Sequence, residues 1–237
     1  IIATAVDTTT GTFSGDIDVD GTTNLDVVDI DGAVDMASSL TVAGNVSIDG
    51  GTIKLDGNYP TGTDNVALGN LALDDGSLSG AYNVAIGTEA LSANTSGQQN
   101  TAVGRQSLRD NTTGQYNVAL GLNAMRINIS GDSNTAVGVQ ALRDNTTGDN
   151  NVAVGYTALL ANTTASNLVA VGYQALNSNT TGGSGVAIGY NALEENTTGS
   201  GNTAVGRQAL QENTTAANNT ALGNTSLTAN TTGALNT

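Results

Sequence analysis

Few residues of this chain could carry out chemistry, because it contains no histidine and no cysteine. Imidazole acid–base catalysis, Ser-His and Cys-His nucleophiles, disulfides and Cys/His zinc sites are therefore excluded. The main remaining candidates for catalysis are Glu194 and Glu195, since paired carboxylates can cleave a polysaccharide. Adjacent residues of a strand point to opposite faces, which argues against such a pair. We expect no enzyme activity and no cofactor.

A second acidic pattern, Asp-Ile-Asp-Val-Asp-Gly at residues 16–21, matches the start of an EF-hand calcium loop. The twelfth position of that loop is Val27, where calcium needs a bidentate glutamate, and alternating strand-like sequence stands where helices should flank it. We therefore interpret the segment as a solvated acidic strand face that ends in a turn, and we expect no metal site.

Three tyrosines are candidates for ligand binding. Tyr156, Tyr173 and Tyr190 follow one another at intervals of 17 residues, and their rings could form a platform that stacks on sugars. The alternative is a tyrosine ladder that only stabilises the structure between successive repeats.

These intervals belong to a repeat that dominates the chain. A box of Asn, Thr or Val, Ala, an aliphatic residue and Gly recurs with its glycine at 69, 87, 104, 121, 138, 155, 172, 189, 206 and 223. After one step of 18, every step is 17 residues, which is too short for a pair of helices. The period predicts an all-β fold: a parallel β-solenoid, or β-roll, of about ten coils over residues 59–237. An acidic β-rich segment, residues 1–58, precedes it.

Two columns of the repeat are predicted to form the core. They are the aliphatic residue before each box glycine and a leucine four residues after it, such as Val137 and Leu142. The box alanine should then point outward, and its constancy favours contact with another chain. We therefore predict a homo-oligomer, a trimer, whose interface includes Ala85, Ala102, Ala119, Ala136, Ala153, Ala170, Ala187 and Ala204.

Many repeats contain a corner turn of Asn-Thr-Thr-Gly after the leucine column, as at 111–114 and 145–148, and stacking should align these residues into Asn and Thr ladders. The corner glycine is alanine at Ala165 and Ala216, so a positive φ is not required there. A formal charge of −15 excludes nucleic acid as a partner, and no apolar run is long enough for membrane insertion.

Two families resemble parts of this sequence. The boxes at 83–87 and 185–189 resemble those in the heads of trimeric autotransporter adhesins, which are left-handed parallel β-rolls packed in threes. The 17-residue unit is longer than the adhesin unit, so handedness stays open. Residues 11–15 through 35–44 are similar to segments of tail-fibre proteins of marine bacteriophages.

These resemblances imply a structural, adhesive fibre at a virion tail or cell surface, which contacts a glycan or receptor of the host. Two alternatives stay open from the sequence. A polysaccharide-cleaving tailspike would use Glu194 and Glu195, and an ice-binding solenoid would use the Thr ladders.

Overall fold

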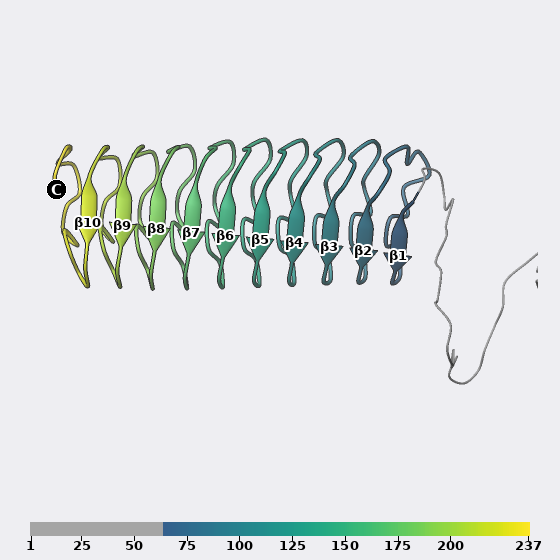
Figure 1. Ribbon diagram of the computed structural model, residues 1–237, viewed down its shortest axis with the longest axis horizontal. Helices are drawn as coiled ribbons and strands as arrows, with labels where there is room; N and C mark the ends of the chain where they lie inside the picture. The colour runs from purple at the N-terminus through teal and green to yellow at the C-terminus, as the bar shows by residue number, and fades with distance from the viewer. Residues whose placement is uncertain (1–63) are drawn as a thin grey trace, which may run out of the picture. The chain divides into compact units, whose positions relative to one another are not determined.

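The computed structural model describes residues 64–237, which form a parallel β-solenoid (Figure 1). This part contains no helix and has one strand of three residues in each coil. The strands are β1 (Val66–Leu68), β2 (Val84–Ile86), β3 (Thr101–Val103), β4 (Val118–Leu120), β5 (Thr135–Val137), β6 (Val152–Val154), β7 (Val169–Val171), β8 (Val186–Ile188), β9 (Thr203–Val205) and β10 (Thr220–Leu222). The predicted all-β solenoid is confirmed. The calcium-like loop at 16–21 and the predicted boundary near residue 58 lie outside the described residues.

The ten strands form one parallel sheet in sequence order, and each strand pairs in register with the next. Ala136 faces Ala119 on one side and Ala153 on the other, as a constant 17-residue period requires. The additional residue of the single 18-residue step lies outside the sheet. Six residues separate Leu73 from Gly80, where five separate Leu91 from Gly97. The additional residue lies in a turn where the Asp75 carboxylate accepts hydrogen bonds from the Ser77 backbone N and Oγ.

The orientation of the strand side chains was predicted wrongly. From Ala85 to Ala221 the box alanines are buried inside their own coil, and the aliphatic residues before the glycines are partly exposed, for example 40% at Ile188. The alanines predicted at a subunit interface therefore form part of the core: Ala85, Ala102, Ala119, Ala136, Ala153, Ala170, Ala187 and Ala204. The predicted leucine column is buried from Leu73 to Leu210.

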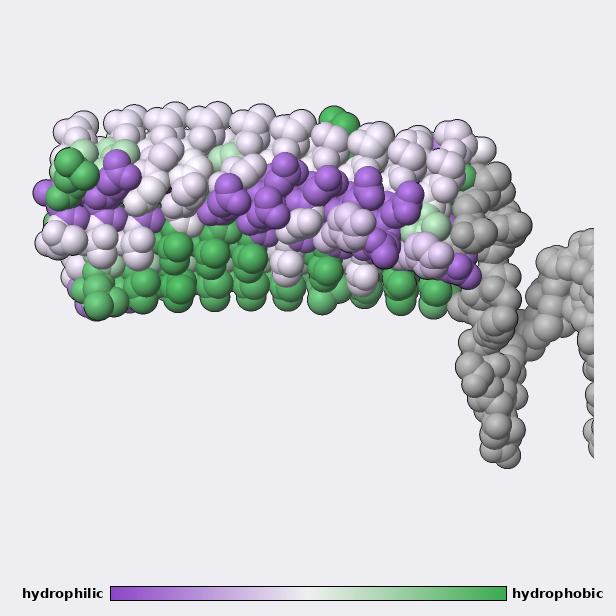
Figure 2. All heavy atoms as spheres, turned by 45° about the horizontal axis from the view of Figure 1, so that its top comes forward, coloured by the Kyte–Doolittle hydropathy of each residue, from purple (hydrophilic) through white to green (hydrophobic). Residues whose placement is uncertain are grey.

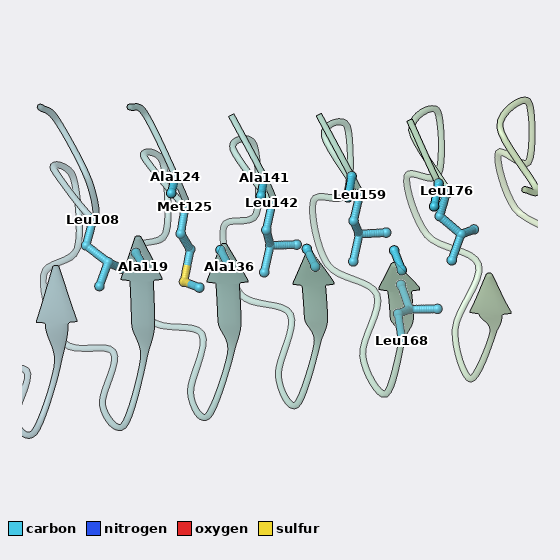
Figure 3. Packing of buried hydrophobic residues seen from close by; sticks show 14 of the residues in the cluster. Leu108, Ala119, Ala124, Met125, Ala136, Ala141, Leu142, Leu159, Leu168 and Leu176 are labelled. Atoms are coloured by element: carbon cyan, nitrogen blue, oxygen red, sulfur yellow. The ribbon is translucent and has the colours of Figure 1, made fainter. Parts of the chain in front are cut away.

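The thinness of the coil explains this reversal. In each coil the segment after the turn brings a large side chain, such as Leu108, Met125 or Leu142, toward the strand (Figure 3). Only a small side chain fits against it from the sheet, so alanine takes the inward position and the larger Val, Ile or Leu faces outward. The leucine column adopts φ between 49° and 54°, an unfavourable region for leucine, which the burial of Leu73 to Leu210 offsets.

Two buried asparagine ladders complete the interior. In the box ladder, the backbone N of Asn100 donates to Asn83 Oδ1 at 3.0 Å, and Asn100 Nδ2 donates to Gly114 O at 2.9 Å. In the corner ladder, Asn111 Nδ2 donates to Asn94 Oδ1 at 2.8 Å and to Gly114 O at 3.1 Å. The predicted corner turn and its Asn ladder are confirmed. Each buried amide thereby satisfies groups in its own coil and in a neighbouring one.

The box glycines are required by the turn that follows each strand. Gly138 has φ of 135°, and a Cβ at this position would lie 2.4 Å from the carbonyl oxygen of Gly155 in the next coil. Any side chain would therefore both strain the backbone and separate the coils. The corner glycines have no such positive φ, as Ala165 and Ala216 predicted.

Candidate functional surfaces

The three predicted tyrosines form a continuous stack on the outside of the solenoid. The ring centroids of Tyr156 and Tyr173 are 5.4 Å apart, those of Tyr173 and Tyr190 are 5.2 Å apart, and the planes are within 10° of parallel. The Arg207 guanidinium lies 5.8 Å from the centroid of the Tyr190 ring and covers the end of the stack. All three side chains remain nearly half exposed.

This stacking determines what the tyrosines can bind. A sugar ring packs on the face of an aromatic ring, and here the inner faces already cover one another. Edges and hydroxyl groups are what remain exposed along the stack. The arrangement therefore favours the ladder interpretation for Tyr156, Tyr173 and Tyr190 over the sugar platform.

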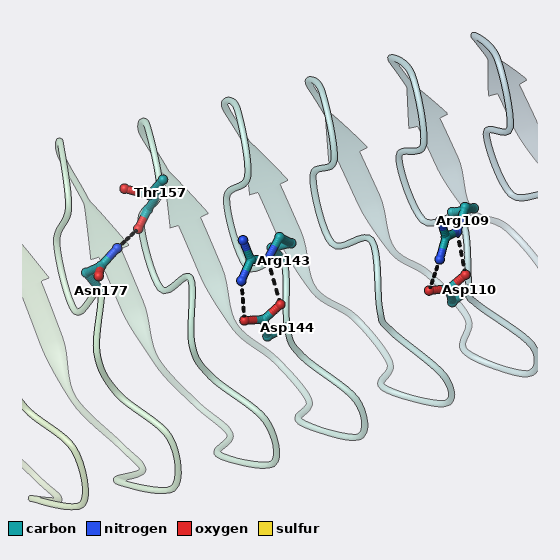
Figure 4. Close-up of polar contacts among 6 residues, drawn as sticks. All are labelled: Arg109, Asp110, Arg143, Asp144, Thr157 and Asn177. Carbon is teal, nitrogen blue, oxygen red and sulfur yellow. Dashed lines mark hydrogen bonds and ion pairs between the residues drawn. The ribbon is translucent and has the colours of Figure 1, made fainter.

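Polar side chains line the segment that lies opposite the sheet. Arg109 pairs with Asp110 through two contacts, Nε to Oδ1 at 2.6 Å and Nη2 to Oδ2 at 2.8 Å, and Arg143 pairs with Asp144 in the same way (Figure 4). These hydrogen bonds raise the pKa of both arginines. The pairs are partly exposed, so each stabilises the coil only slightly. They leave few arginines available for an anionic ligand.

The candidate carboxylates of a polysaccharide-cleaving site are Glu194 and Glu195. Glu194 Oε2 accepts hydrogen bonds from Asn191 Nδ2 at 2.6 Å and from Gln211 Nε2 at 2.7 Å, so it links two coils. Glu195 is exposed, whereas Glu194 is half buried. Glu194 therefore has a structural role in the described array. No group of three carboxylates that could hold a metal lies within residues 64–237.

In the corners with two threonines, the two side chains differ in their environments. The first is hydrogen-bonded to the next coil, as when Thr146 Oγ1 donates to Thr163 O at 2.9 Å. The second, such as Thr147 or Thr164, is exposed. The first threonine column therefore stabilises the stack, and the second forms one exposed row of hydroxyl groups. A flat ice-binding surface would need two such rows side by side.

The outer face of the sheet is the largest surface that sequence reasoning missed. It carries two columns of Val, Thr, Ile and Leu, from the second and fourth box positions, and not one charged residue. An apolar strip runs along the lower edge of the array, beside a strip of polar side chains (Figure 2). Of these columns, the one before the glycines was predicted to lie in the interior because it is always aliphatic. The signal that could have placed them outside is their variation among Val, Ile, Leu and Thr, against ten identical alanines.

Comparison with known proteins identifies no relative: no family model, curated protein or solved structure matches this chain. In the residues that the structure describes, no helix is long and apolar enough to cross a membrane.

Proposed function

We propose that this protein is a structural and adhesive fibre: a rigid rod that assembles with copies of itself, as a trimer, and contacts a host surface. The observation that carries the proposal is the uncharged outer face of the sheet. Parallel sheets are normally covered on both faces, and here the coil itself covers only the inner one. Ten strands make the open face about 48 Å long. A continuous uncharged face of this length differs from the single, scattered apolar residues of an ordinary protein surface.

Rigidity follows from the way successive coils are joined. Most coils bond to the next through the strands, two Asn ladders and the threonine column, for example from Asn111 to Asn94 and from Thr146 to Thr163. No coil can bend without breaking several of these bonds at once. Rods of this kind hold a binding surface at a distance, which suits a fibre at a virion tail or cell surface. The resemblance to adhesin heads supports three copies.

The oligomeric state tests this proposal. Sedimentation of the wild-type chain should give three times the chain mass. Replacing Val137 and Val154 by Lys places two charges on the outer sheet face and should release folded monomers, because an unpaired charge is costly inside an interface. Replacing the exposed Thr147 and Thr164 by Lys adds the same charge on adjacent coils elsewhere and should leave the mass unchanged. A monomeric wild-type chain, or equal behaviour of the two variants, would contradict the proposal.

A further inference from the structure

Two other tyrosines lack the packing that explains the ladder. Tyr82 and Tyr116 are the most exposed tyrosines of the described residues, at 55% and 56%. Among residues 64–237, neither ring stacks on another aromatic ring, whereas Tyr156, Tyr173 and Tyr190 stack on one another. The ring faces of Tyr82 and Tyr116 are therefore not occupied by aromatic neighbours.

The backbone at these two positions is unfavourable for tyrosine. Tyr82 has φ of 60° and Tyr116 has φ of 59°, in the left-handed region that large side chains avoid. Every described coil has a positive φ at this position, and most coils place a small or polar residue there, such as Ser133, Asn150 or Asn218, with Leu235 in the last coil. The leucine column tolerates the same region because it is buried, but Tyr82 and Tyr116 gain no such burial. Packing within the chain therefore does not explain why two large aromatic side chains stand at this strained position, and their exposed rings are available for a ligand.

The two rings lie in one column of the array, two coils apart. Gln99, from the coil between them, donates its backbone N–H to Ala81 O at 3.0 Å, and Tyr116 donates its own to Gln98 O at 3.1 Å. The stacking register therefore continues through all three coils. Two coils correspond to about 10 Å, roughly the length of two sugar rings in an extended chain. At this separation the two tyrosines cannot stack on each other, unlike tyrosines on adjacent coils.

The chemistry around the rings is neutral and rich in amides. The column of Tyr82 and Tyr116 holds Gln99 between them, and the neighbouring column holds Ala81, Gln98 and Gln115 over the same coils. Gln98 and Gln99 are exposed, and none of these residues carries a charge. Aromatic faces pack on the C–H face of a sugar, and amides exchange hydrogen bonds with its hydroxyl groups. Over these three coils neither column carries a charge, and the charged residues of the two columns, such as Asp64 and Asp132, belong to other coils.

We propose that Tyr82 and Tyr116 form a contact site for an extended neutral glycan, with Gln98 and Gln99 bonding its hydroxyl groups. The site gives the proposed adhesive function a ligand class, and it rests on that function. It needs no cleft, because tyrosines supply large, rigid contact areas on an open surface.

Binding of the full chain to immobilised neutral oligosaccharides of two to six sugars, from cellulose, chitin and mannan, tests this site. Wild type should bind at least one series, with affinity rising up to the length that reaches both rings. Tyr82→Ser with Tyr116→Ser should bind about tenfold more weakly. Tyr156→Ser with Tyr190→Ser removes two tyrosines at the same two-coil spacing from the ladder, and it should bind as wild type does.

Three results would overturn the inference. Wild type that binds none of these glycans has no such site, and if it still sediments as a trimer, the fibre proposal stands without it. Equal loss in the two double variants would mean that the effect is not specific to Tyr82 and Tyr116. A changed sedimenting mass for the Tyr82 and Tyr116 variant would assign these tyrosines to a contact between copies of the chain.

Discussion

Leu168 and Gly185 occupy successive places in the box asparagine ladder, and they fit each other in size. A Cβ at Gly185 would already touch Leu168 Cδ2 at 3.4 Å, so a side chain longer than alanine at 185 would have to share the space that the buried leucine fills. The ladder continues as far as Leu168, because the backbone N of Leu168 still donates to Asn151 Oδ1 at 3.0 Å. It resumes after the pair, where the backbone N of Asn219 donates to Asn202 Oδ1 at 2.9 Å.

The pair should therefore be strongly coupled in stability. Gly185→Asn alone should destabilise the fold by pressing a polar side chain against Leu168, and Leu168→Asn alone should leave a cavity beside Gly185. The double variant restores the ladder sequence, so it should be more stable than the sum of the single changes predicts, by about 1–3 kcal/mol. Urea unfolding of the four proteins measures this coupling.

Introducing the same Leu and Gly pair at Asn117 and Asn134, two successive positions of the intact ladder, provides the control. Asn117→Leu alone should be more destabilising than Asn117→Leu combined with Asn134→Gly, because the second change opens the space that Leu168 has at Gly185. Additive effects at both places would show that the two positions do not share their space.

The reversed strand orientation predicts a difference between neighbouring residues. Ala136→Leu should lower the stability of the fold itself by about 1–3 kcal/mol, because the additional carbons have no space against Leu142 and Met125. Val137→Leu should be tolerated by the fold, since Val137 is partly exposed on the outer sheet face. Thermal unfolding of the two variants decides the matter. If Val137→Leu were the more destabilising change, the assignment of Ala136 to the interior would be wrong.

The period and the corners of this fold could be predicted from the sequence because they depend on chain length and backbone chemistry. A constant 17-residue step fixes the stacking, and Asn111 and Gly114 form the turn that their types favour. The inward face could not be predicted from size alone, because a three-residue strand such as β5 has no further alternation to decide it. The inward face is decided by Leu142, which belongs to another segment of the coil and leaves space only for alanine.

The candidate site was predicted only in part, for a related reason. The sequence placed Tyr156, Tyr173 and Tyr190 in one exposed column, and the structure confirms the column. Whether their ring faces were free depended on side-chain geometry that spacing alone does not give. Tyr82 and Tyr116 could not be predicted from the sequence, because Gln99 stands between them in the column and their positive φ is visible only in the structure.

The corner ladder leads to a prediction that depends on pH. Asn128 Nδ2 donates to Asn111 Oδ1 at 2.8 Å and to Gly131 O at 3.0 Å, and both acceptors are buried. Asn128→Asp replaces this donor by an oxygen, so the ionised side chain would face two acceptors without access to water, although its other oxygen can keep the hydrogen bond from Asn145 Nδ2 at 2.8 Å. Burial and these neighbours disfavour the charged form, so the pKa of the new carboxyl should rise above its unfolded value of about 3.9.

Stability should consequently depend on pH in a defined direction. Below pH of about 4 the carboxyl is protonated in both states and can donate one of the two lost bonds, so Asn128→Asp should be mildly destabilising. As the pH rises from there through the folded-state pKa, the loss should grow to about 3 kcal/mol or more. Asn150→Asp, an exposed residue with φ of 57° that aspartate tolerates, adds the same charge and should show no such dependence. Thermal unfolding between pH of about 4 and about 8 compares the two, and the absence of histidine keeps the wild-type baseline free of imidazole titration. Parallel pH curves for the two variants would mean that Asn128 is not buried in a ladder of amides.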